Sequence, residues 1–160
     1  MELKAERIAI PEGCNVILGQ THFIKSADDL FETVAEQAPS AKFGIAFCEA
    51  SQKRLVRVEG NDEGMKKKAA EIALQIACGH AFVVLMRDAF PVSVLNALKS
   101  VSEVCNIYCA TANTLEVIVA ETESGRGIMG VIDGATPLGV EGAADREERK
   151  ELLKRFGYKS

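Results

Sequence analysis

An unbroken run of five apolar residues at 82–86 constrains the fold more than any other stretch. The run is short and valine-rich, with Gly79 shortly before it and Pro91 shortly after it. Such a run predicts a strand buried on both faces, which belongs in the middle of a sheet. His80, one of only two histidines, stands where this strand should start. The preceding helix is expected to end at Gly79 in a left-handed cap, so that His80 lies at a helix-to-strand junction beside a cleft.

Length and composition narrow the class of protein. A chain of 160 residues predicts one domain, which we expect to span 1–160. The net charge of −4 argues against a general nucleic-acid binder, which should be basic. The chain lacks an apolar leader near its first residue and any run of membrane-spanning length, so we expect a cytoplasmic protein and no membrane partner. The five cysteines form no CxxC pair and are interpreted as reduced core thiols.

The remaining periodicity predicts three helices interleaved with strands, followed by more strands and a last helix. The expected strands are 7–10, 15–23, 42–50, 54–59, 104–110, 115–121 and 126–132. The expected helices are 26–38, 61–76, 91–101 and 145–156, with Ser26 and Asn61 as caps of the first two. This order predicts an α/β fold, close to α+β, with helices packed on a mixed sheet in a single compact domain. Some helical connections should be right-handed crossovers between parallel neighbours.

The two histidines have different expected roles. An imidazole is largely neutral near pH 7, so one ring nitrogen of His80 can attack phosphorus. The alternative is a hydrogen-bonded structural histidine, and position alone leaves the two interpretations even. His22 alternates with Thr21 and Phe23, which favours a structural role or a pocket wall. Two histidines this far apart make a weak zinc site, and no metal ligand set is predicted with certainty.

A glycine-rich stretch at 125–130 has GxGxxG spacing, but strand-forming residues follow it instead of a helix. It is either a plain glycine hairpin or one whose backbone at Gly125 and Gly127 approaches a phosphate, with Arg126 as the charge partner. The chain has no GxxxxGK[ST] motif. Any ATP must therefore be bound in another way.

Three carboxylates stand at the ends of expected strands: Glu49, Glu121 and Asp133. They are either solvated turn residues or ligands of a Mg²⁺ that bridges phosphate oxygens. Glu49 and Asp133 are the preferred candidates for holding such an ion or for orienting the imidazole of His80.

Taken together, several segments resemble the adenosine-specific kinase family of small archaeal and bacterial proteins. They are 19–25 (GQTHFIK), 43–51 (FGIAFCEAS), 54–62 (RLVRVEGND), 79–83 (GHAFV), 90–97 (FPVSVLNA), 109–113 (CATAN), 119–122 (VAET), 125–128 (GRGI) and 131–134 (VIDG). The resemblance covers nearly the whole chain and rests on the number and order of these segments. It implies a compact α/β fold that binds adenosine or its nucleotides and is phosphorylated on a histidine, which here is His80.

The resemblance leads to an expected mechanism and its rivals. ATP would supply phosphate to His80, the Gly125–Gly127 backbone with Arg126 would neutralise it, and Asn113 would read adenine with its carboxamide. One alternative is a non-catalytic sensor of AMP or ADP, and another is a scaffold with a structural histidine. The resemblance also implies a homo-oligomer, a trimer or a multiple of it. The charged helix at 145–156 supports that expectation, since it can cover little exposed sheet edge.

Overall fold

β5 (Ala81–Arg87) is the middle strand of the larger of two sheets in the computed structural model, which describes all 160 residues. The other elements are β1 (Glu2–Ile8), β2 (Asn15–Thr21), α1 (Ser26–Gln37), β3 (Lys42–Cys48), β4 (Val56–Gly60), α2 (Glu63–Ile76), a 3₁₀ turn η1 (Pro91–Ser93), α3 (Leu95–Lys99), β6 (Val104–Thr111), β7 (Leu115–Thr122), β8 (Gly125–Asp133) and α4 (Ala143–Arg155). The larger sheet has the order β4-β3-β5-β2-β6, and the smaller has the order β1-β7-β8. The predicted α/β class and the predicted central strand are both confirmed.

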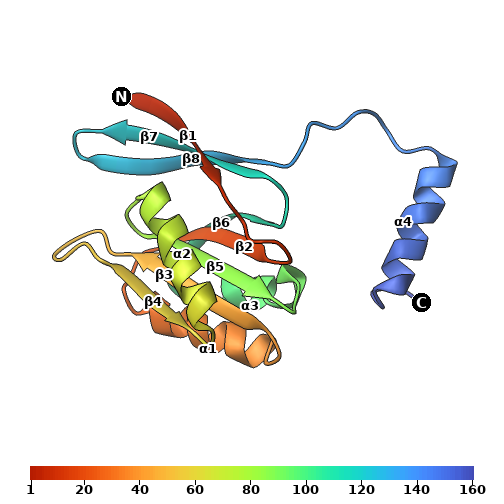
Figure 1. Ribbon diagram of the computed structural model, residues 1–160, viewed down its shortest axis with the longest axis horizontal. Helices are drawn as coiled ribbons and strands as arrows, with labels where there is room; N and C mark the ends of the chain where they lie inside the picture. Colours follow the sequence, from red (N-terminus) through yellow and green to blue (C-terminus); the bar gives the residue numbers. More distant parts are fainter.

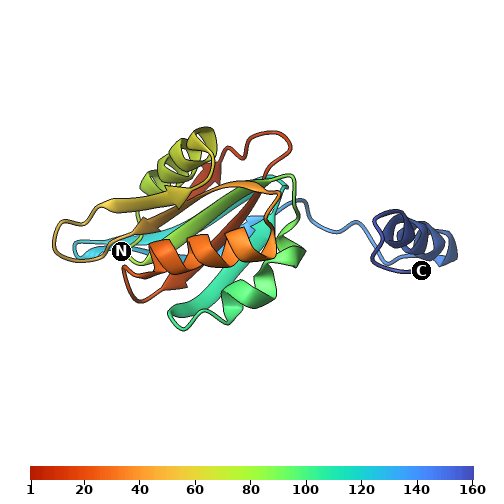
Figure 2. The ribbon, with the colours of Figure 1, turned by 90° about the horizontal axis from the view of Figure 1, so that it is seen from below.

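The two faces of the larger sheet bury two separate cores (Figure 1, Figure 2). Val83 and Leu85 point into a core shared with α2 and the smaller sheet. Phe82, Val84 and Met86 point into a core closed by α1 and α3. This alternation along β5 explains the continuous apolar run, because both of its faces are covered.

Every strand pairing in the molecule is antiparallel, so the predicted parallel neighbours are absent. The crossover β2–α1–β3 joins two strands that run in the same direction. However, β5 lies between them and pairs antiparallel with both. The strand at the start of the chain also pairs with β7 in the smaller sheet and not with β2.

Three predicted helix caps are wrong in detail. Lys25, not Ser26, occupies the N-cap of α1, and the buried Ser26 hydroxyl has no hydrogen-bond partner. Asp62 caps α2 by accepting a hydrogen bond from the Met65 amide at 2.9 Å. Ala77, with φ of 53°, takes the left-handed conformation that was expected of glycine.

Gly79 is favoured by close packing and not by its backbone conformation. A Cβ built on Gly79 would lie 3.0 Å from the Cβ of Ala50, at the end of β3. The predicted helix at 91–101 is also shorter than expected, because it divides into η1 and the five-residue α3.

The five cysteines differ in their exposure to solvent. Cys14, Cys48 and Cys78 are buried, whereas Cys105 is exposed, so the prediction of core thiols does not hold for Cys105.

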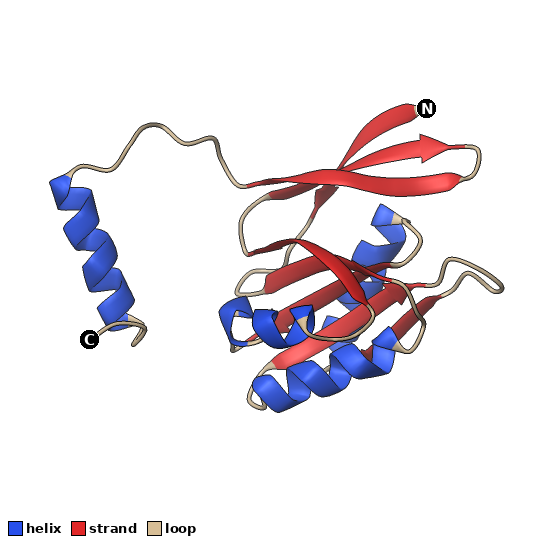
Figure 3. Cartoon of the chain, turned by 180° about the vertical axis from the view of Figure 1, so that it is seen from behind, coloured by secondary structure: helices blue, strands red, loops and turns tan.

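The helix α4 lies apart from both sheets, at the end of an extended segment (Figure 3). None of the helices is both long enough and apolar enough to cross a membrane. The cytoplasmic location stays a prediction.

Candidate functional site

His80 has a left-handed backbone, with φ of 64°. Its amide donates to the Cys48 carbonyl at 2.7 Å, and its carbonyl accepts from the Thr21 amide at 3.0 Å. The residue is therefore held by the ends of β3 and β2, one on each side of β5. A positive φ at a residue other than glycine costs energy and is common at functional sites. The surrounding strands fix this conformation, and with it the direction of the side chain.

The imidazole of His80 stacks on Phe47, with ring centroids 5.9 Å apart and an interplanar angle of 21°. It lines a cavity of about 280 Å³, which we call the His80 hollow. Besides His80, the hollow is lined by His22, Phe23, Ile24, Phe47, Glu49, Ala50, Ser51 and Gln52. The two histidines of the chain thus share one cavity, as the pocket-wall interpretation of His22 expected.

Glu49 anchors the loop that follows β3. Its Oε2 accepts hydrogen bonds from the Leu55 amide at 3.0 Å and from the Arg57 guanidinium at 3.1 Å. The bond from the Leu55 amide, aided by Arg57, lowers the pKa of the Glu49 carboxyl, which is therefore ionised at neutral pH. Its other oxygen, Oε1, makes no hydrogen bond. Glu49 thus places a negative charge on the wall of the His80 hollow.

A second cavity, of about 410 Å³, adjoins the first, and we call it the arginine cleft. Glu49 and Ala50 line both cavities, and Gly79, in the cleft, directly precedes His80. The cleft is lined by Cys48, Glu49, Ala50, Arg54, Leu55, Val56, Ala73, Leu74, Ala77, Cys78, Gly79, Ser124, Gly125 and Arg126. It combines apolar side chains, which suit a base, with two guanidinium groups, which suit phosphate.

Arg126 reaches this cleft, but carboxylates already hold its guanidinium. Nη2 lies 2.6 Å from Glu6, Nε lies 3.3 Å from Glu121, and Nη1 donates to the Gln75 carbonyl at 3.2 Å. A phosphate would have to compete with these two carboxylates for the same cation. By contrast, the backbone at Gly125 is open, because a Cβ built there would meet nothing within 4 Å. The same holds at Gly127.

Asn113 and Asp133 lie together, but at the other end of the molecule. The Asn113 carboxamide donates to Asp133 at 3.5 Å. Asn113 follows Thr111, which pairs with Val16 near the start of β2, whereas His80 bonds to Thr21 at its end. Five residues of strand span roughly 17 Å. Within one chain, the structure therefore brings His80, Glu49 and Arg126 together and leaves Asn113 and Asp133 apart from them.

Comparison with known proteins identifies the family of this chain. The family model for adenosine specific kinase matches residues 7–159. The chain belongs to the adenosine specific kinase family. Its fold is similar to the crystal structure of the PH1918 protein from Pyrococcus horikoshii OT3, with a TM-score of 0.95 and 42% identity over 99% of this chain and 98% of that one. No curated protein matches the chain.

Sequence reasoning missed two features of this member of the adenosine specific kinase family, and the first is a set of unpaired backbone amides. The amides of Phe23, Ile24 and Lys25 make no hydrogen bond, and they precede the first turn of α1. Phe23 and Ile24 line the His80 hollow together with His80, so two of these unpaired amides belong to residues of its wall.

A second missed feature is a buried acidic pair behind this loop. Glu103 is 4% exposed and neither of its oxygens has a hydrogen-bond partner, while its carbonyl accepts from the His22 amide at 3.1 Å. Burial, together with the neighbouring carboxylate of Asp29, raises the pKa of Glu103. No sequence signal distinguishes Glu103 from an ordinary surface glutamate.

The predicted magnesium ligands do not form a preformed metal centre. No group of three or more histidine, cysteine or acidic side chains is placed to hold a metal ion. Glu49 lies by the His80 hollow, and Asp133 lies near the far end of β8 from Arg126. Mg²⁺ often binds through one or two carboxylates plus substrate phosphates, and of these two Glu49 alone is near His80.

Proposed function

We propose that this protein is a phosphotransferase that takes phosphate from ATP onto His80 and acts on adenosine or its nucleotides. An imidazole nitrogen of His80 attacks the γ-phosphorus of ATP. The bond from that phosphorus to the bridging oxygen breaks, and ADP leaves with its electron pair. The position of His80 carries this proposal, since its imidazole faces a cavity from a backbone conformation that two strands hold in place.

The surrounding groups have distinct proposed roles. The base and sugar occupy the arginine cleft against Leu55 and Leu74, and the phosphates extend towards His80 past the open Gly125–Gly127 backbone. The guanidinium of Arg126 contributes positive charge once a phosphate competes for it. Glu49 either shares a Mg²⁺ with the phosphates or accepts a hydrogen bond from the imidazole through its free Oε1.

Asn113 and Asp133 enter this scheme through a second subunit. We propose a homo-oligomer, a trimer or a multiple of it, in which pockets between subunits complete the nucleotide site. An Asn113 supplied by a neighbouring copy would then read the adenine edge, which it cannot reach from its own chain. Light scattering at micromolar protein concentration tests the oligomer separately from the chemistry.

The decisive experiment is intact-mass measurement after incubation with Mg-ATP, with and without adenosine. The phosphotransferase proposal predicts an acid-labile mass increase of one phosphate and consumption of ATP that depends on adenosine. Binding of AMP or ADP without turnover would instead select a nucleotide sensor. If the protein shows neither nucleotide binding nor phosphate labelling, His80 is a structural residue.

A further inference from the structure

The last residues of the chain form an arm that makes little contact with its own body. We define the C-terminal arm as residues 134–160, comprising the segment 134–142, α4 and a short tail. Leu138 and Val140 are fully exposed, and α4 buries no residue. No hydrogen bond or ion pair joins residues 135–160 to residues 1–133. The charged groups of the arm pair within it, as Arg149 does with Glu141 at 2.8 Å. Figure 1 shows the resulting gap between α4 and the sheets.

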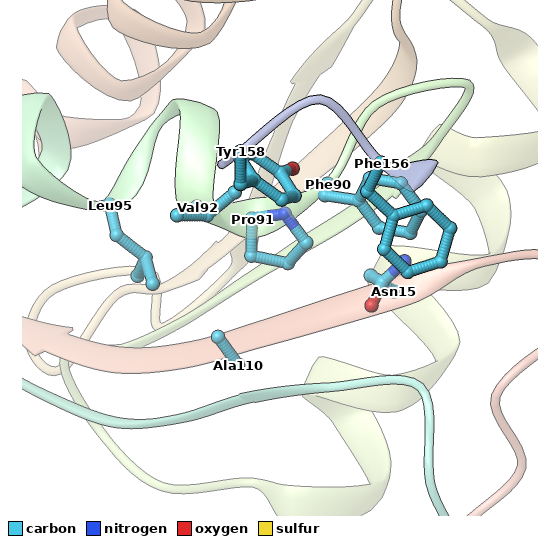
Figure 4. Close-up of a pocket in the computed structure, with 8 residues that line it drawn as sticks. All are labelled: Asn15, Phe90, Pro91, Val92, Leu95, Ala110, Phe156 and Tyr158. Atoms are coloured by element: carbon cyan, nitrogen blue, oxygen red, sulfur yellow. The ribbon is translucent and has the colours of Figure 1, made fainter. Parts of the chain in front are cut away.

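The arm touches the body through two aromatic side chains. Phe156 and Tyr158 lie against an apolar groove of about 350 Å³ at η1 and the start of α3 (Figure 4). The rings of Phe156 and Phe90 are tilted, with centroids 6.0 Å apart. Even so, Phe156 stays 52% exposed, Phe90 53% and Val92 60%. The contact is aromatic, but about half of the surface of these side chains remains exposed to solvent.

Contacts within one chain contribute little to the stability of the helix in the arm. Isolated helices shorter than about 12–15 residues are marginal in water, and α4 has 13 residues. Its stability must come from packing, yet it buries nothing against its own chain. Two half-exposed aromatic rings do not compensate for ordering the whole arm.

We propose that the arm is exchanged between copies of this chain, so that Phe156 and Tyr158 fill the groove at Phe90 and Val92 of a second copy. Each copy carries both halves of the contact, which is the condition for a closed, symmetric exchange. The exposed Leu138 and Val140 would then lie between the two bodies instead of in water. The inference rests on the self-association proposed above, but not on the chemistry at His80.

The length of the connection permits this exchange. Nine residues separate β8 from α4. Fully extended, they span at most about 30 Å, which is comparable to the width of a small domain. The segment is therefore long enough to carry α4 to an adjacent subunit, and only the half-buried contacts of Phe156 and Tyr158 hold the arm to its own chain.

The test uses two differently tagged full-length chains produced together, one with Phe90→Cys and the other with Phe156→Cys, each also carrying Cys105→Ser. After mild oxidation we expect a covalent dimer containing both tags. Leu74→Cys in place of Phe90→Cys is the matched control, because Leu74 is exposed on α2 outside the groove, and it should give no such dimer. A disulfide that forms only when both cysteines are on one chain would overturn the exchange.

A second variant separates the arm from the rest of the assembly. Phe156→Asp with Tyr158→Asp alters two half-exposed side chains, so the fold should persist while light scattering reports a smaller particle. An unchanged mass would show that other surfaces hold the oligomer and would refute the arm's role. A monomeric wild-type protein would refute the arm exchange and leave His80 labelling as a separate question.

Discussion

Two substitutions at His80 should separate its chemistry from its backbone strain. Asparagine tolerates the left-handed region, so His80→Asn should keep the two backbone hydrogen bonds and the fold. Valine is β-branched, and a left-handed backbone costs an L-residue roughly 1–2 kcal/mol. Because histidine already bears part of this cost and a β-branched residue tolerates positive φ less well, His80→Val should lower the free energy of unfolding by at most about that amount. For a domain of this size, that corresponds to a fall in Tm of roughly 2–8 °C.

Both variants should lose all acid-labile phosphate after incubation with Mg-ATP, since neither side chain has a nucleophilic ring nitrogen. Intact-mass spectrometry measures the label, and thermal unfolding measures the stability. The reasoning fails if His80→Asn still takes up acid-labile phosphate. It also fails if His80→Val is as stable as the wild type, because the strain inferred from a φ of 64° would then be absent.

Three further predictions concern other groups. Arg126→Ala should weaken AMP binding and spare adenosine in calorimetry, because a charge-assisted hydrogen bond to phosphate is worth about 1.5–3 kcal/mol; equal losses would leave Arg126 a purely structural ion-pair partner. The raised pKa of Glu103 stabilises the fold in acid, and this stabilisation is lost as the pH rises above the usual glutamate range. Glu103→Gln should therefore melt above the wild type at pH 8, with the difference shrinking towards pH 4; a lower Tm throughout would contradict this. A thiol reagent should modify the exposed Cys105 first and Cys48 last, since burial raises the pKa of Cys48 to about 11; peptide mapping decides the order.

The sequence predicts local features of this fold well. The run at 82–86 is apolar on both faces, so its burial follows from composition alone. The hairpin before Arg126 is also correct, because turn residues separate two strand patterns there. The sequence does not predict which strands pair with one another. Antiparallel insertion of β5 between β2 and β3 depends on contacts distant in sequence, which hydrophobic periodicity does not encode.

The same distinction applies to the candidate site: local sequence predicts some of its features, and others depend on strand pairing. Glu49 and His80 could be grouped because each stands at the end of a predicted strand. The ion pairs of Arg126 with Glu6 and Glu121 could not, since they depend on the pairing of β1 with β7, which are distant in sequence. The sequence therefore does not show that two carboxylates already hold the guanidinium of Arg126.

The strand order also explains why His80, the residue that we propose to accept phosphate, has a fixed orientation. β5 starts between the ends of β2 and β3, so the residue just before it must satisfy the backbone of both neighbours. Bonds to Cys48 and Thr21 on opposite sides force a left-handed turn at that residue, which directs its side chain out of the sheet. A histidine there is fixed without any hydrogen bond to its ring in the structure. Both of its nitrogens therefore remain free for phosphate and for a proton, which is the arrangement that a phosphate-accepting imidazole requires.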